Sequence, residues 1–116
     1  MKLVKSYDIA EMALDGYAEE FHKHISPEFK QKLKSSCELI DKLAEEFGGE
    51  TCVATVDICT EEFVVSLQCP DMELQKGCSH YFFDLIKSVH QFSFSSNGDS
   101  LDMKFRFSGV WQDGKA

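Results

Sequence analysis

The stretch FSFSSNGDSLDMKFRF, residues 92–107, alternates large apolar side chains with small or polar ones on both sides of an Asn-Gly pair. Alternation with a period of two is typical of a β-strand that buries one face. Asn-Gly is the strongest short-range signal for a type I′ turn of two residues. The stretch therefore predicts an antiparallel hairpin, with strands at 91–96 and 99–108.

The alternation also predicts how the two strands of this hairpin pair. If Asn-Gly supplies both loop residues, Phe94 faces Leu101 and Phe92 faces Met103, so the large apolar side chains share one face. A slip of one residue would set Phe94 against Asp102 and bury a carboxylate, which costs several kcal/mol or raises its pKa. We therefore expect the Phe94–Leu101 register.

A second pair of alternating segments lies upstream, at residues 51–59 and 62–69, and is rich in β-branched residues. Their turn contains no glycine, so a two-residue primed turn is not expected. A four-residue loop from Thr60 to Phe63 would place Val56 opposite Leu67 and keep one face apolar. This predicts a first hairpin, with Phe63 in its turn.

The rest of the chain has helical periodicity. Residues 6–24, 27–47 and 71–90 each place apolar side chains at spacings of three and four. We expect Ser6 to cap the first helix, whose apolar face is formed by Ile9, Ala13, Tyr17 and Phe21. Ser26 and Pro27 are typical of a cap followed by the first helical residue, so the first two helices form an antiparallel pair.

This order, α-α-β-β-α-β-β, predicts a single two-layer α+β domain over residues 1–116, with a four-stranded antiparallel sheet that carries its helices on one face. The strand order stays open. The element order is loosely similar to that of profilin-like and Roadblock-type adaptor domains and of small acidic secretion chaperones. Because no motif accompanies the similarity, it implies nothing about function.

Composition limits the classes of function. The chain of 116 residues has a net charge of −8 and one arginine, Arg106, and it lacks the basic patch of a nucleic-acid-binding protein. It has five cysteines, an odd number without a paired spacing, and no apolar run long enough for a signal peptide or a membrane span. We expect a soluble cytoplasmic protein that binds neither nucleic acid nor membrane.

Two cysteines and one histidine are close together in LQCPDMELQKGCSHYFF, residues 67–83. In the predicted elements Cys69 lies on the inward face of a strand and Cys78 on the apolar face of a helix. His80 lies about 200° around that helix from Cys78, so the two side chains point apart. Since a structural zinc site needs four ligands, we expect no metal and no other cofactor here.

Other reactive residues are isolated. His22 and His24 fall at a predicted helix end, where their side chains diverge. Cys59 is the only cysteine expected to be exposed, and His90 ends the third helix. Nothing in the sequence joins Cys59 to His90 or to an oxyanion hole, and no common catalytic motif is present. We expect no catalytic site.

The outward face of the sheet is the candidate binding surface. Its predicted side chains are short, polar or charged, and five of them could make complementary contacts to a partner: Asp57, Gln68, Asp102, Lys104 and Arg106. Such a face can be solvated, can meet a second subunit, or can bind a polar ligand or peptide. Unprotected edge strands add a further route to self-association.

The hypothesis that follows is a non-enzymatic protein–protein interaction module, homodimeric, that binds another protein through its acidic helices or its polar sheet face. One alternative is an inhibitor from a mobile element that occupies the basic surface of a nucleic-acid-binding protein. Another is a small-molecule sensor or enzyme with its pocket between sheet and helices, for which Cys59 or Asp57 would be the residues to test.

Overall fold

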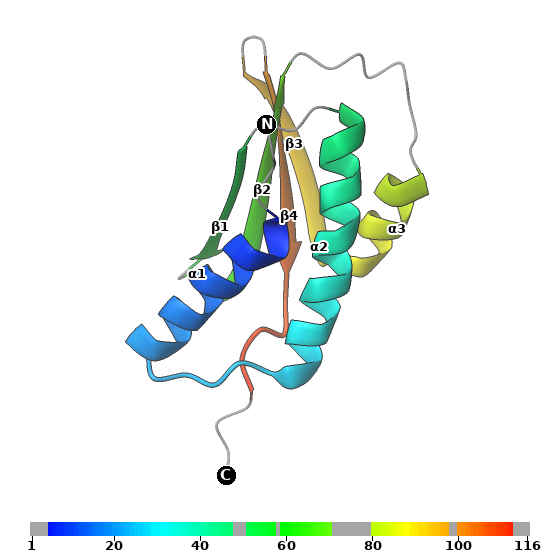
Figure 1. Cartoon of the computed structure of the whole chain (residues 1–116). Coiled ribbons are helices and arrows are strands. Elements are labelled where there is room, and N and C mark those ends of the chain that lie inside the picture. Colours follow the sequence, from blue (N-terminus) through cyan, green and yellow to red (C-terminus); the bar gives the residue numbers. More distant parts are fainter. Residues whose placement is uncertain (1–4, 48–50, 58, 71–79, 98–99, 113–116) are drawn as a thin grey trace.

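The computed structural model describes residues 5–47, 51–57, 59–70, 80–97 and 100–112. Three helices and four strands follow one another as the sequence predicts (Figure 1). The elements are α1 (Ser6–Glu20), α2 (Pro27–Phe47), β1 (Thr51–Asp57), β2 (Glu62–Pro70), α3 (His80–Ser88), β3 (Gln91–Asn97) and β4 (Ser100–Phe107). The α+β class and the element order are therefore confirmed.

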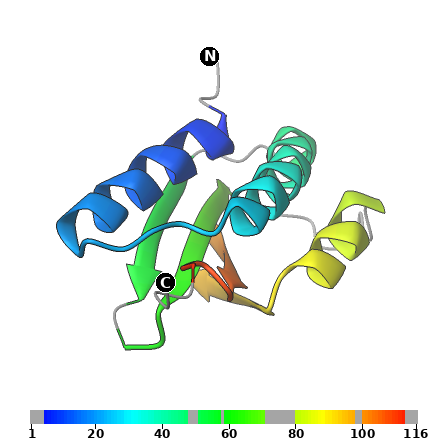
Figure 2. The ribbon, with the colours of Figure 1, turned by 90° about the horizontal axis from the view of Figure 1, so that it is seen from below.

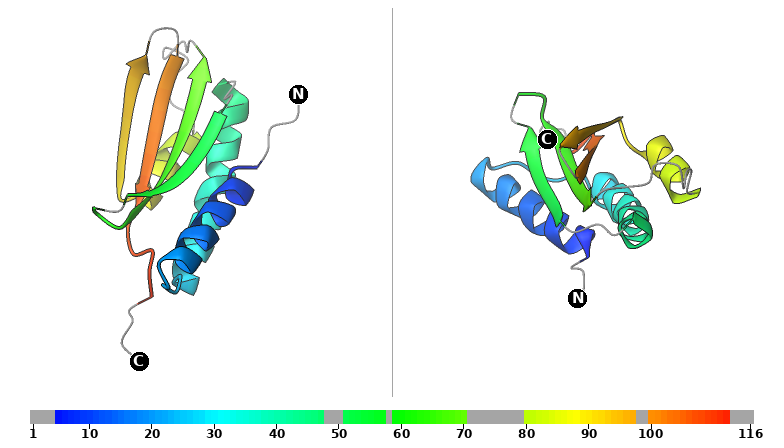
Figure 3. Two further views of the ribbon diagram at one scale, coloured as in Figure 1. Left: turned by 90° about the vertical axis from the view of Figure 1, so that its left-hand side faces the viewer. Right: turned by 90° about the horizontal axis from the view of Figure 1, so that it is seen from above.

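The four strands form one antiparallel sheet in the order β1-β2-β4-β3, so β1 and β3 are its edges. The helices lie on one side of this sheet and leave the other side uncovered (Figures 2 and 3). Inward-facing residues of β2 and β4 alternate with outward-facing ones, and three phenylalanines on them are completely buried: Phe63, Phe105 and Phe107. The core therefore lies between these two central strands and the helices.

The second hairpin forms, but its register differs from the expected one. Phe94 pairs with Met103 rather than Leu101, and Asn97 pairs with Ser100 as the last residue of β3. The shift is by two residues, so the described side chains of the hairpin, such as those of Phe92, Met103 and Phe105, keep their expected face. It places Phe92 opposite Phe105, with ring centroids 5.2 Å apart. In the expected register Phe92 would have faced Met103, so the observed register gains an aromatic pair.

The first hairpin also differs from the expected register, because its turn begins earlier. Asp57 Oδ1 accepts hydrogen bonds from the backbone N–H groups of Cys59 (3.0 Å) and Thr60 (3.4 Å). The N–H of Glu61 closes the turn by donating to the Asp57 carbonyl at 2.7 Å. Phe63 is consequently a strand residue opposite Val56, not a turn residue. Asx turns of this kind compete with the strand ladder, and apolar alternation alone does not locate them.

Helix α1 ends at Glu20, four residues before the expected end. The N–H of Lys23 donates to the carbonyl of Ala18 at 2.9 Å and the N–H of His22 donates to that of Glu19 at 3.4 Å. These are the two bonds of a Schellman motif, in which His22 takes the left-handed position with φ 55°. Because glycine usually occupies that position and histidine stands there instead, the usual sequence signal for a helix end is missing.

The start of α1 differs from the prediction, and its expected apolar face is buried only in part, where Ala13 and Tyr17 pack against the core. Ser6 is the first helical residue, not the cap: it is buried and its hydroxyl donates to the carbonyl of Cys37 at 3.0 Å. The residues that α1 buries completely are Ser6, Ala10 and Leu14. The expected stripe lies to the side of this face, and its last member, Phe21, is 42% exposed.

Helix α2 has the expected bounds, and Ser26 caps it by accepting the N–H of Phe29. The Phe29 ring, 3% exposed, stands edge-on to the rings of Phe63 and Phe107 at 6.2 Å from each. These T-shaped pairs join the first turn of α2 to β2 and β4. Helix α2 is thus the element that closes the centre of the core.

Helix α3 is described over His80–Ser88; its expected start at residue 71, like the predicted position of Cys78, falls in residues 71–79, which lie outside the described part of the chain. The predicted face of this helix is therefore described only in part. Ser36 on α2 and Ser88 on α3 share a hydrogen bond of 3.0 Å, which ties the two helices together. Within the described ranges, the longest helices are too polar to cross a membrane.

Candidate functional site

The structure brings together two of the five residues predicted on the outward sheet face. Arg106 Nη1 lies 3.1 Å from Asp57 Oδ2 and 3.5 Å from Glu62 Oε1. His90 Nε2 lies 3.4 Å from the other oxygen of Glu62. Arg106 thus lies between the carboxylates of Asp57 and Glu62, and the His90 ring lies beside Glu62, at the end of the sheet where β1 turns into β2. The sequence reading missed Glu62 and His90 here.

This cluster holds the first hairpin in place. The pKa of Asp57 lies below its ordinary value of 3.8, because Arg106 and the backbone N–H groups of Cys59 and Thr60 donate to its carboxylate. Arg106 thus pairs with both carboxylates of the cluster within the chain. These pairs and the backbone hydrogen bonds to Asp57 account for the geometry of the turn.

The other three predicted residues lie further along the same face. Gln68 and Asp102 are direct neighbours on β2 and β4, while Lys104 is exposed and lies in the row between them and Arg106. Residues two apart on a strand are separated by about 6.6 Å, so these three occupy two successive rows of the face. The five predicted residues therefore share the outward face, with Asp57 and Arg106 in direct contact and the other three further along it.

Two of the described cysteines have thiols that burial makes harder to ionise. Burial raises the pKa of Cys37 to about 12 and that of Cys52 to about 11. Cys69 is buried as expected, and Cys59 is exposed as expected. The described ranges contain no group of three or more His, Cys, Asp or Glu side chains that could hold a metal ion.

The exposed face of α1 is the most strongly charged surface that one element provides. Helix α1 carries five Asp or Glu residues and no Lys or Arg, in a chain whose net charge is −8. Four exposed residues, which we call the α1 face, lie within about 60° of one another on the helix, opposite the buried side: Asp8, Met12, Asp15 and Glu19. Met12 is 76% exposed in the middle of this acidic stripe.

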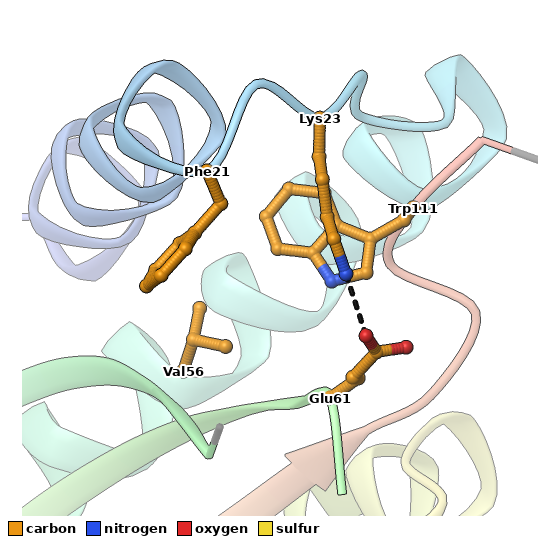
Figure 4. A pocket seen from close by; sticks show the side chains of 5 residues that line it. All are labelled: Phe21, Lys23, Val56, Glu61 and Trp111. Carbon is orange, nitrogen blue, oxygen red and sulfur yellow. Dashed lines mark hydrogen bonds and ion pairs between the residues drawn. The ribbon is translucent and has the colours of Figure 1, made fainter. Parts of the chain in front are cut away.

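A small hollow lies beyond the C-terminal end of α1. Its volume is about 70 Å³, and five residues line it: Phe21, Lys23, Val56, Glu61 and Trp111 (Figure 4). We call it the Trp111 hollow. In Figure 4 the side chain of Lys23 passes across the Trp111 ring toward Glu61, with Phe21 and Val56 forming the other wall. The Lys23 Nζ pairs with Glu61 Oε1 and lies 5.5 Å from the ring centroid of Trp111.

Three sharp backbone turns bring these side chains together. His22 and Glu61 are the non-glycine residues with positive φ in the described part of the chain, at 55° and 59°, and Gly109 has φ 71°. Each adjoins a segment that lines the hollow. A left-handed residue other than glycine costs roughly 1–2 kcal/mol, so the surrounding contacts must hold these two positions.

Backbone hydrogen bonds fix Trp111 in this position. The N–H of Gln112 donates to the carbonyl of His24 at 2.7 Å, and the N–H of Ser26 donates to that of Val110 at 3.0 Å. The C-terminal segment therefore runs beside the loop between α1 and α2. No sequence pattern predicts this long-range contact, whereas the spacing of the α1 face at 8, 12, 15 and 19 is that of a helical stripe and was predictable.

Comparisons with protein-family models, with curated proteins and with solved structures find no match for this chain.

Proposed function

We propose that this protein is a non-enzymatic interaction module that binds a basic surface of another protein through the α1 face. The observation that carries the proposal is that α1 has five carboxylates and no basic residue of its own. Lys30 of α2 pairs with Asp15 at 3.3 Å and with Glu11 at 3.6 Å. The attraction therefore depends chiefly on the exposed carboxylates of Asp8, Glu19 and Glu20. A partner with clustered Lys and Arg side chains would be attracted to this stripe and oriented by it. Surfaces of that kind are typical of nucleic-acid-binding proteins.

Met12 distinguishes the α1 face from a merely solvated helix. Its side chain is 76% exposed between Asp8, Asp15 and Glu19, although methionine is one of the residues most often buried. A flexible apolar side chain within a charged rim is typical of a contact surface, because it adapts to the shape of a partner. The carboxylates would raise the rate of association with a basic partner, and Met12 would add apolar area to the interface.

The test is a selection of random displayed peptides on the immobilised protein, followed by affinity measurements on two charge-matched variants. Asp8→Asn, Glu19→Gln and Glu20→Gln together form the α1 variant. Glu28→Gln, Glu38→Gln and Glu45→Gln form the control on α2. All six residues are exposed, and each set includes one first-turn carboxylate, so the two variants lose equal charge from exposed helix positions.

We expect the selected peptides to be rich in Lys and Arg and to lose about tenfold in affinity for the α1 variant. Three exposed charge pairs at about 0.5 kcal/mol each amount to about 1.5 kcal/mol, which is roughly a factor of ten in Kd. The α2 control should bind like the unmodified chain, and raised salt should weaken all binding. Equal losses in both variants, or peptides without basic residues, would disprove the proposal.

We also propose that the chain forms a homodimer through the exposed edge of β3. This strand, QFSFSSN, contains no charged residue and no proline, the two devices that usually keep sheet edges from pairing. The opposite edge is partly covered, since Tyr17 of α1 shares a hydrogen bond of 3.1 Å with Thr55 of β1. Antiparallel pairing of two β3 strands about a two-fold axis would extend the sheet to a second copy.

Native mass spectrometry of the chain and of its Ser93→Lys variant tests the homodimer. We expect a dimer for the unmodified chain and a monomer for Ser93→Lys, because lysine on an edge strand blocks pairing. Ser35→Lys, on the exposed side of α2, adds the same charge away from the edge and should stay dimeric. A monomeric unmodified chain, or a dimer that survives Ser93→Lys, would exclude β3 as the interface.

A further inference from the structure

The Trp111 hollow already holds a cation that the chain itself supplies. The ammonium of Lys23 lies over the Trp111 ring, 5.5 Å from its centroid, and pairs with the carboxylate of Glu61. An aromatic face beside a carboxylate is a chemical combination that recognises alkylammonium and guanidinium groups. Phe21 and Val56 add the apolar wall that the methylene stem of such a side chain needs (Figure 4).

Lys23 is held weakly enough to be displaced. Its side chain is 38% exposed and that of Glu61 is 59% exposed, and ion pairs with such exposure are easily replaced by competing charges. The Trp111 backbone, by contrast, is fixed by its bridge to Ile25 and by the bond from Gln112 to His24. The binding walls would therefore remain in place after Lys23 left.

We propose that the Trp111 hollow receives a Lys or Arg side chain of the basic partner, and that Lys23 occupies the charged end of this subsite in the free chain. This rests on the proposed function, because it assumes a basic partner on α1. Glu19 and Glu20 are the last residues of α1 and Phe21 follows them directly, so the acidic helix leads to the hollow. A volume of about 70 Å³ suits one aliphatic stem, whereas metabolite pockets measure roughly 300 Å³ or more.

The fluorescence of Trp111 reports occupation of the hollow directly, because the chain contains one tryptophan. The probe is N-acetyl-tetralysine amide, titrated at constant ionic strength into the unmodified chain and into three variants. Lys23→Met keeps the stem and removes the competing charge. Lys23→Arg keeps the charge, and Glu61→Gln removes the carboxylate that would bind the incoming cation. A thermal melt of each variant verifies that it folds.

We expect a saturable change in Trp111 fluorescence, with a half-saturation concentration about three- to tenfold lower for Lys23→Met and higher by a similar factor for Glu61→Gln. Lys23→Arg should behave like the unmodified chain. If Lys23→Met bound the probe no more tightly than the unmodified chain, Lys23 would not be a competitor and the proposal would be wrong.

An NMR titration with the same tetralysine probe separates this proposal from the proposed function. Amide shifts in an NMR spectrum measure probe binding anywhere on the chain, and the α1 variant measures the share due to the α1 face. Binding that depends on α1 and leaves Trp111 unchanged would refute the subsite while the proposed function stands. A Trp111 response that is unaffected by the α1 variant would support the subsite and refute α1 as the docking face.

Discussion

Replacing Phe29 by alanine should destabilise the protein more than any surface change, because this ring joins α2 to the two central strands. It is 3% exposed and makes T-shaped pairs with Phe63 and Phe107 at centroid distances of 6.2 Å. Truncating a buried phenylalanine to alanine costs about 3–5 kcal/mol, which includes the cavity that is left. That is a large part of the 5–15 kcal/mol by which domains are typically stable.

Urea unfolding followed by circular dichroism measures this loss. For a chain of 116 residues the unfolding entropy is about 0.24 kcal/mol/K, so a loss of 3–5 kcal/mol corresponds to a fall in Tm of roughly 12–20 °C. The dependence of the free energy on urea concentration should keep its slope, because the surface exposed on unfolding hardly changes.

Phe21→Ala is the matched control, since it removes the same atoms from a ring that is 42% exposed. Its expected cost is about 1–2 kcal/mol, from the smaller area that it buries and its stacking on Tyr17 at 5.9 Å. If Phe29→Ala cost no more than Phe21→Ala, the packing of α2 on the sheet would not be as described here.

Four further predictions concern pH, thiols, metal and backbone. The pKa of Asp57 is depressed in the folded state, so its contribution to the free energy of unfolding is present above pH 3.8 and is lost as pH falls through the lower folded value. Asp57→Asn should therefore flatten the pH dependence of stability in that acidic range. A pH profile that the substitution leaves unchanged would contradict this. Iodoacetamide at pH 8 should modify Cys59 before Cys37, whose pKa of about 12 should keep it unmodified until the chain unfolds. Equal rates of the two by mass spectrometry would show that the Cys37 thiol is accessible in the folded chain. Treatment with EDTA should not change Tm, whereas a large drop would reveal a metal that involves the stretch 67–83. His22→Gly should raise the free energy of unfolding by about 0.5–1 kcal/mol, because glycine adopts the left-handed C′ position at no steric cost, and a destabilised variant would mean that the His22 side chain makes contacts of its own.

Element type and order were predictable because the hydrophobic period changes clearly along the chain. Period two marks 92–107 and the segments around β1 and β2, and spacings of three and four mark α2, whose Ser26–Pro27 start was also readable. The same alternation fixed which side chains face inward, since a shift of two residues leaves the faces unchanged. The side of the sheet on which each residue lies was therefore predicted better than the residue that it pairs with on the neighbouring strand.

Register and helix ends depend on single side-chain contacts that periodicity does not encode. Asp57 begins the first turn with its carboxylate, and His22 ends α1 in a position where glycine is usual. The Trp111 hollow depends on residues from three distant segments, which come together only when residues 110–112 run beside the α1–α2 loop. The candidate site was therefore placed on the sheet face, where a pattern was visible, and not at the end of α1.

NMR mapping of a peptide selected on the unmodified protein would test most directly whether α1 is the docking surface. The largest amide shift changes are expected at the α1 face, Asp8, Met12, Asp15 and Glu19, together with the indole N–H of Trp111. Changes confined to the outward sheet face, at residues such as Lys104 and Gln68, with α1 unchanged, would contradict a function based on this acidic helix.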